Sequence, residues 1–180
     1  MEKVAPVVPD EFKDLYVRDA RHPIYKIPDP VLRKAAAPVP KVSKKTGLLA
    51  DDLIRIMREA NGVGLAAPQI GVLQRVIVIS PDRKPTVLIN PVVISATGSC
   101  VMQEGCLSLP GLYGDVERPE TVEVEALDRR GRAFIYEMEG MAARVVQHEI
   151  DHLDGILFID KAAPATLHWE SPETNPDQNE

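Results

Sequence analysis

The sequence predicts an α+β fold in which β-strands gather around one late helix that carries two histidines. Three observations lead to this prediction. Apolar residues recur with helical spacing in segments 46–60 and 140–152, and short β-branched runs lie between them. The chain has 180 residues, which is enough for one domain with a buried core. Its 44% hydrophobic and 27% charged residues are typical of a soluble globular protein.

The predicted helices have recognisable ends. Residues 29–30 (DP) combine an N-cap with a proline suited to a first turn, so we expect one or two helical turns after them. Segment 46–60 ends at residues 61–62 (NG), because these residue types readily adopt the left-handed conformation that closes a helix. Gly155 marks the end of segment 140–152 for the same reason.

The predicted strands lie between these helices. Residues 75–80 (RVIVIS) form a β-branched run that is too short for a helix. Segments 87–94, 120–127 and 132–138 are also predicted to be strands. Residues 130–131 (RG) separate the last two, which indicates a hairpin turn.

The chain is expected to have three parts. Residues 1–22 contain several prolines and form an N-terminal arm, residues 23–161 form a single domain, and residues 162–180 form a flexible polar tail. No apolar run reaches the roughly 18 residues that cross a bilayer, and the chain starts without an apolar signal core. We therefore expect a cytoplasmic protein with no membrane partner. The net charge of −6 argues against a direct nucleic-acid role.

The strongest chemical signal is residues 147–152 (QHEIDH). His148 and His152 are four residues apart on the predicted helix, so both imidazoles project from one face and can reach one ion. Glu149 follows the first histidine and can act as a general base on a metal-bound water. The alternative is a helix that merely carries two surface histidines and an acid.

A catalytic metal site needs a third protein ligand. His22 and His168 fall in the arm and the tail, where solvated histidines are expected, and Cys100 suits a small core residue. Cys106 lies in residues 104–110 (EGCLSLP), where a glycine gives the backbone freedom and a proline follows. A thiolate there completes a Cys-His-His set with one position open for water, which is typical of a catalytic site. The sequence thus predicts a metal-dependent hydrolase.

Residues 62–71 (GVGLAAPQIG) form a third segment of interest. Its small residues let the backbone approach a ligand or another strand closely, and Gln69 offers an amide donor. It lacks the Lys-Ser/Thr ending of a phosphate-binding loop. By itself, the segment is better interpreted as a glycine-rich turn after a helix.

Together, the three segments resemble the signatures of the peptide deformylase family. They appear in the family's order as residues 62–69 (GVGLAAPQ), 104–108 (EGCLS) and 147–152 (QHEIDH). The likeness extends over residues 27–160. It implies an α+β fold with β-sheets wrapped around the helix that carries the His-Glu-x-x-His motif. It also implies a hydrolase of linear amide bonds that removes the N-formyl group from N-formylmethionyl peptides and nascent proteins, releasing formate.

The resemblance implies a role for each residue of the site, with residues 23–161 as the catalytic metallohydrolase domain. The expected ligands of one divalent ion per chain are Cys106, His148 and His152. The ion is expected to be Fe²⁺ natively, with Zn²⁺, Ni²⁺ or Co²⁺ able to take its place. A metal-bound water is the expected nucleophile, and Glu149 is the general base and acid. Gln69 and the backbone N–H of Leu107 are expected to hold the formyl oxygen.

A formylated peptide is expected to add as a strand beside residues 63–64 and to place its methionine side chain in an apolar pocket. The expected substrate-binding residues are Val63, Gly64, Met102, Glu104, Gly105, Met141 and Val145. Ordinary core packing is the alternative for the apolar members. Arg118 is expected to form an ion pair with Glu104 that steadies the loop around the cysteine.

Two positions depart from many bacterial members of the family. Residues 112–113 (LY) and 143–144 (AR) look more like the plant-organelle and related bacterial branch, known as type 1. Arg144 falls at the edge of the predicted helix, and the sequence does not show how it shapes the outer wall of the pocket. A transient association with the ribosome accords with the family, although the acidic charge gives it no support.

Two other functions remain open. A metallopeptidase of the His-Glu-x-x-His class takes its third ligand downstream of the helix, where only His168 and the tail acids are available. A non-catalytic, zinc-stabilised binding module has no need of Glu149. Cys106 and Glu149 therefore distinguish the three interpretations.

Overall fold

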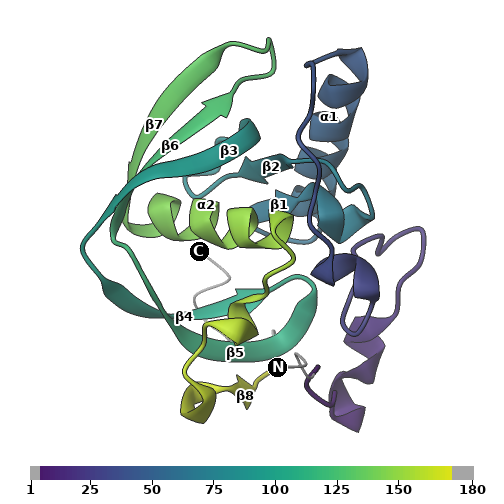
Figure 1. Ribbon diagram of the computed structural model, residues 1–180. Helices are drawn as coiled ribbons and strands as arrows, with labels where there is room; N and C mark the ends of the chain where they lie inside the picture. The colour runs from purple at the N-terminus through teal and green to yellow at the C-terminus, as the bar shows by residue number, and fades with distance from the viewer. Residues whose placement is uncertain (1–4, 172–180) are drawn as a thin grey trace.

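The computed structural model describes residues 5–171, which form two antiparallel sheets with one helix between them (Figure 1). The larger sheet has five strands in the order β1-β2-β3-β6-β7, and the smaller has three in the order β4-β5-β8. The strands are β1 Gly64–Ala66, β2 Val76–Ile79, β3 Thr86–Thr97, β4 Cys100–Cys106, β5 Leu109–Arg118, β6 Thr121–Leu127, β7 Ala133–Glu139 and β8 His168–Trp169. The α-helices are α1 Lys44–Glu59 and α2 Gly140–Leu153. Five 3₁₀-helices complete the described chain: η1 Asp10–Tyr16, η2 Pro30–Arg33, η3 Ala67–Ile70, η4 Phe158–Asp160 and η5 Pro164–Thr166.

The two α-helices cover opposite faces of the larger sheet. In β2, Val76 and Val78 pack in a cluster with α1, whereas Ile77 and Ile79 pack in a cluster with α2. Successive side chains of a strand point to opposite faces, so a strand between two helices must be apolar throughout. This arrangement explains the continuous β-branched run in residues 75–80. It also confirms the predicted α+β fold with sheets around α2.

The predicted elements are present, with ends that differ by at most three residues. Asp29 caps η2 by accepting a hydrogen bond from the Val31 N–H at 2.9 Å. Asn61 and Gly155 follow α1 and α2 with φ angles of 52° and 68°, as the left-handed ends of helices require. β6 and β7 pair antiparallel through the predicted hairpin.

The sequence does not predict β5. Pro110 and Gly111 lower its strand propensity, because proline lacks an N–H for strand pairing and glycine weakens a strand. β5 forms because it pairs with β4 on one side and β8 on the other. Gly111 has a φ angle of 81°, and a Cβ atom there would lie 2.6 Å from Cδ1 of Phe12. Long-range pairing and close packing therefore override local preference at this strand.

Parts of the expected arm and tail carry secondary structure. The ring of Phe12 in η1 is buried, and its centroid lies 5.2 Å from that of Trp169 in β8. These aromatic residues are far apart in the sequence, so no local pattern reveals that they pack together. Residues 1–4 of the arm and 172–180 of the tail lie outside the described residues. Across residues 5–171, none of the helices has the length and apolar character needed to span a membrane.

Candidate metal centre

Helix α2 and the end of β4 bring three potential metal ligands together. His148 and His152 lie one turn apart on α2, with ring centroids 5.0 Å apart. Cys106 is the last residue of β4, and its Sγ lies 3.3 Å from Nε2 of His152. The ligand atoms of all three residues lie within 4.8 Å of one another. His22 and His168 are exposed and do not belong to this group.

The donor set fits a divalent transition-metal ion. One thiolate sulfur and two imidazole nitrogens suit zinc and ferrous iron alike. Burial lowers the pKa of His152 well below its ordinary value, and the charge of His148 lowers it further, so this imidazole is neutral as a ligand must be. Burial also lowers the pKa of His148, but hydrogen bonds with Cys106 and Glu104 raise it well above the ordinary value. An ion therefore has to displace a proton from His148 when it binds.

Glu149 is a buried carboxyl group beside these ligands. Its side chain is shielded from solvent, and among the described residues Oε2 has no hydrogen-bond partner. Burial raises the pKa of Glu149 to about 7, because the charged form is poorly solvated there. A carboxyl group with a pKa near neutrality can both accept and return a proton at working pH.

The glycine-rich segment is more than a turn, because it forms β1 and η3 next to Glu149. A Cβ atom on Gly64 would lie 2.8 Å from Cγ1 of Val145 and 2.9 Å from Cδ of Glu149. A Cβ atom on Gly62 would lie 2.7 Å from Cδ1 of Leu107. The glycines therefore allow β1 to approach α2 and the end of β4 closely.

Gln69 directs an amide donor towards the ligand group. Its Oε1 accepts a hydrogen bond from the Ala66 N–H at 2.9 Å, which orients the amide. Its Nε2 donates to Oγ of Ser108 at 3.1 Å and to Sγ of Cys106 at 3.7 Å. The amide N–H groups thus lie where an oxygen atom bound at the centre can accept from them.

Ser108 is a site residue to which the sequence assigned no role. It is completely buried, and its backbone N–H donates to Sγ of Cys106 at 3.4 Å. Together with Gln69, it places hydrogen-bond donors on the sulfur. Its place in the family segment 104–108 was the signal that could have identified it.

A buried ion network lies behind His148. Glu104 accepts from Nε and Nη2 of Arg118 at 2.6 and 2.9 Å, so the expected ion pair is present. Its Oε2 lies 2.9 Å from Nδ1 of His148, which leaves Nε2 of that ring for a metal. Burial by itself would raise the pKa of Glu104, but the bonds to His148 and Arg118 hold it well below its ordinary range. We expected Glu104 to be a substrate-binding residue, whereas its carboxylate bonds here to protein groups.

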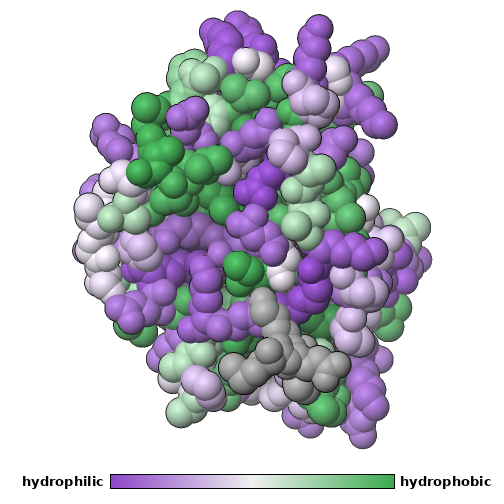
Figure 2. Space-filling view, viewed as in Figure 1, coloured by the Kyte–Doolittle hydropathy of each residue, from purple (hydrophilic) through white to green (hydrophobic). Residues whose placement is uncertain are grey.

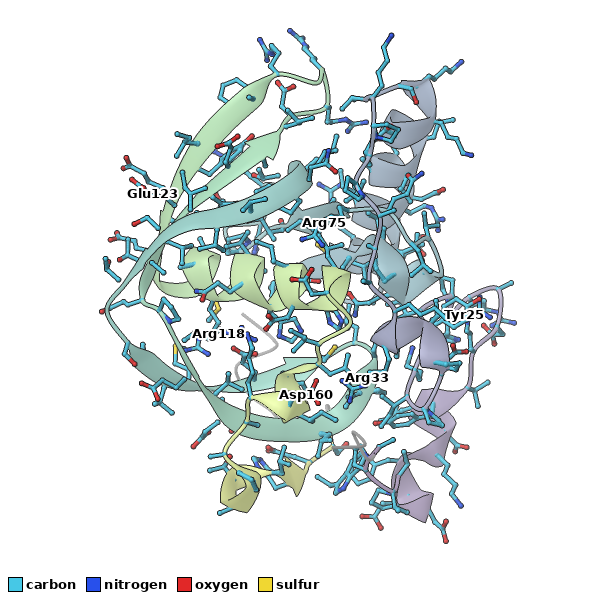
Figure 3. The ribbon with its side chains drawn as sticks, viewed as in Figure 1. Tyr25, Arg33, Arg75, Arg118, Glu123 and Asp160 are labelled. Carbon is cyan, nitrogen blue, oxygen red and sulfur yellow. The ribbon has the colours of Figure 1, made fainter. Side chains whose placement is uncertain are left out.

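The network continues towards the surface through Asp151, another residue without an assigned role. Arg118 donates from Nη1 to Asp151 at 2.8 Å, and Lys161 donates to the same carboxylate at 2.8 Å. Arg118 is the last residue of β5, and its label lies below α2 in Figure 3. In the space-filling view, hydrophilic residues gather over the same part of the molecule (Figure 2).

Arg144, whose contribution to the pocket the sequence left open, is buried in the structure. Its side chain is 7% exposed and turns inward from α2 to β4 and β5. The guanidinium group is held there because carbonyl and carboxylate oxygens of both strands accept from it. Helical spacing alone could not show which partners this arginine would meet.

The expected pocket residues differ in exposure. Val63, Met102 and Met141 are 50%, 38% and 48% exposed, so core packing does not explain them. Val145 is buried in the cluster between α2 and the larger sheet, and Gly105 is half-buried.

Comparisons with known proteins identify the family of this chain. The family model of polypeptide deformylase matches residues 21–167. The chain is 53% identical over 137 residues to a peptide deformylase of Alkalilimnicola ehrlichii, covering 74% of this chain and 77% of that protein. It is 49% identical over 143 residues to one of Desulfitobacterium hafniense, covering 79% of this chain and 95% of that protein.

Solved structures give the same result. A peptide deformylase from Legionella pneumophila matches with a TM-score of 0.75 and 45% identity, covering 79% of this chain and 86% of that chain. One from Synechococcus elongatus, solved in complex with actinonin, matches with a TM-score of 0.76 and 41% identity. The match covers 78% of this chain and 79% of that chain. The chain therefore belongs to the peptide deformylase family of metal-dependent hydrolases.

Proposed function

We propose that the site formed by Cys106, His148, His152 and Glu149 hydrolyses the formyl group of N-formylmethionyl peptides. The observation that carries this proposal is the buried Glu149 carboxyl group beside a Cys-His-His ligand set. An acid-base group next to an ion site with few protein ligands is the arrangement that metal-assisted amide hydrolysis needs.

The protein's own residues account for the proton transfers. A divalent ion held by the three ligands would supply Lewis acidity, lowering the pKa of water from about 15.7 towards neutrality. Glu149 accepts a proton as water attacks the formyl carbon. It then returns the proton to the leaving amine, because an amide nitrogen cannot depart as an anion.

Gln69 and Leu107 stabilise the developing oxyanion. The Nε2 of Gln69 is oriented by its contacts with Ala66 and Ser108, so it needs little rearrangement to donate. The backbone N–H of Leu107 is the second proposed donor. Removing one such donor typically costs about 2.7–4 kcal/mol of transition-state stabilisation.

The substrate main chain is proposed to add beside β1. β1 lies at the edge of the five-stranded sheet, and the preceding Val63 is half exposed. Main-chain bonds to an edge strand place little demand on later side chains of the peptide. The methionine side chain would contact Met102, Met141 and Val145, with Gly64 and Gly105 allowing close approach.

The native ion is proposed to be Fe²⁺, with zinc, nickel or cobalt able to replace it. Iron bound through a thiolate is expected to make the enzyme sensitive to oxygen. Enzyme reconstituted with iron should lose activity in air, whereas a nickel-loaded control should keep it. Equal loss in both preparations would contradict this part of the proposal.

We further propose that residues 23–161 form the catalytic unit and that it acts in the cytoplasm on nascent chains, with transient association at the ribosome. The family's action on new polypeptides supports this setting.

The decisive experiment is a formate-release assay on formyl-Met-Ala-Ser. The metal-loaded protein should release formate and deformylated peptide, and a chelator should stop the reaction. Internal cleavage of the peptide would support the metallopeptidase alternative. If no metal loading yields formate, the proposed function is refuted.

A further inference from the structure

We propose that Arg144 is a positioning residue for the metal centre, acting on His148 through the carboxylate of Glu104. This inference rests on the proposed function of the Cys106–His148–His152 site. It concerns the buried network behind that site rather than the groups that touch substrate.

Arg144 joins α2 to both strands of the neighbouring hairpin. Its Nη1 donates to Oε1 of Glu104 at 2.6 Å and to the carbonyl oxygen of Val116 at 3.0 Å. Its Nη2 donates to the carbonyl oxygen of Cys100 at 2.7 Å. Three acceptors from β4 and β5 therefore hold one buried guanidinium group that starts from α2.

The two oxygens of Glu104 have different partners because of Arg144. Oε1 accepts from Arg144 and from Nε of Arg118, both at 2.6 Å. Oε2 accepts from Nη2 of Arg118 and lies 2.9 Å from Nδ1 of His148. With two charged donors on Oε1, the carboxylate cannot rotate without breaking both bonds. Oε2 is thereby kept for His148, whose other nitrogen faces the ligand group.

The same side chain links the elements that carry the ligands. Arg144 lies one helical turn before His148 on α2, and Cys100 begins the strand that ends at Cys106. Fixing the start of β4 against α2 limits the movement of the cysteine relative to the histidines. Outer partners of this kind typically change metal affinity by about 10–100-fold when they are lost.

Lysine is the informative replacement, because an ammonium group keeps the charge but cannot reach all three acceptors in the planar geometry of arginine. R144K should weaken Zn²⁺ binding by on the order of tenfold, measured by competition with a chromophoric chelator. The absorption spectrum of the Co²⁺-loaded variant should also change, since it reports the geometry of thiolate and imidazole around the ion. R144Q is the second variant. Before metal binding is measured, the circular dichroism spectrum of each variant is compared with that of the wild type to verify that it folds.

A double-mutant cycle separates positioning from general support of the fold. If Arg144 acts through Glu104, R144K should have little further effect on the Zn²⁺ dissociation constant in the E104Q background. An equal effect in both backgrounds would show that Arg144 only supports the fold. Unchanged metal affinity and an unchanged Co²⁺ spectrum in folded R144K and R144Q would also overturn the proposal.

Arg75 provides the matched control. It is another largely buried arginine, directly before β2, and it contacts the end of α2 by donating to the Leu153 carbonyl at 3.5 Å and to Asp154 at 2.6 Å; it is labelled above the helix in Figure 3. R75K should leave the Zn²⁺ dissociation constant unchanged. Loss of affinity in R75K equal to that in R144K would refute a specific role for Arg144. Wild-type protein that binds no metal would instead refute the proposed function itself.

Discussion

Gly64 lies against the carboxyl group of Glu149, so a methyl group at this glycine would collide with that side chain. A Cβ atom there would lie 2.9 Å from Cδ of Glu149 and would contact Oε1 more closely still. β1 and α2 can therefore meet at this point only if one partner has no side chain. The glycine makes room for the carboxyl group that we propose as the general base.

The substitution Gly64→Ala should lower kcat/KM by at least about tenfold, because a displaced general base loses its contribution of roughly 10²–10⁴ in rate. The measurement is formate release by metal-loaded protein. Gly47→Ala is the matched control, since a Cβ atom at Gly47 meets nothing within 4 Å. That control lies in α1 and should keep full activity while gaining roughly 0.5–1 kcal/mol in stability. Full activity in Gly64→Ala would contradict the assigned contact.

Replacing Glu149 by Gln should abolish turnover and leave the ion in place. The substitution removes proton transfer, worth roughly 10²–10⁴ in rate, but none of the three metal ligands. Metal content by elemental analysis and formate release are measured on the same preparation. A variant that keeps its activity would favour the non-catalytic binding module.

The stability of the metal-free protein should depend on the ionisation of Glu149. Burial raises its pKa to about 7 from the ordinary 4.5. At a pH below 4.5 Glu149 is protonated in both the folded and the unfolded protein, so its ionisation does not lower the stability. As pH rises through this interval, the unfolded chain releases its proton first, so stability falls and then levels off above about pH 7.

Because Gln cannot ionise, the stability difference between wild type and Glu149→Gln should shift in favour of the variant as pH rises. The shift should be on the order of 3 kcal/mol between about pH 4.5 and pH 8. It is measured by urea unfolding in the presence of a chelator. A difference that stays constant over this range would show that the carboxyl group is not desolvated as the structure indicates.

The substitution Cys106→Ala should remove most of the bound ion, because two imidazoles alone hold a divalent ion weakly. Cys100→Ala is the control and should keep one ion per chain, since Cys100 lies outside the ligand group. Both variants are purified without added metal and compared by elemental analysis. Full metal content in Cys106→Ala would instead support the His-Glu-x-x-His metallopeptidase.

The ligand set could be predicted from the sequence because its parts are local. His148 and His152 share a helical face by spacing alone, and Cys106 is distinguished by the residues around it. β5 and β8 could not be predicted in the same way. Pro110 weakens the local signal of β5, and β8 exists because it pairs with that strand.

The tertiary structure also determines which groups the charged side chains bind. Arg118 and Arg144 come from a strand and a helix that are far apart in the sequence, yet both bind Oε1 of Glu104. The sequence left the role of Arg144 open, because a helical pattern shows which way a side chain points but not which groups it contacts.

The sequence by itself determined both α-helices, the strands β2, β3, β6 and β7, the three candidate ligands and the acid between the histidines, since spacing along one helix and residue type act over a few residues. Only the tertiary structure decided how Gly64 accommodates Glu149, how Ser108 and Gln69 surround the sulfur, and how two arginines orient Glu104. These contacts join residues that are distant in the chain, and their free energies depend on burial that arises only once both sheets have closed around α2.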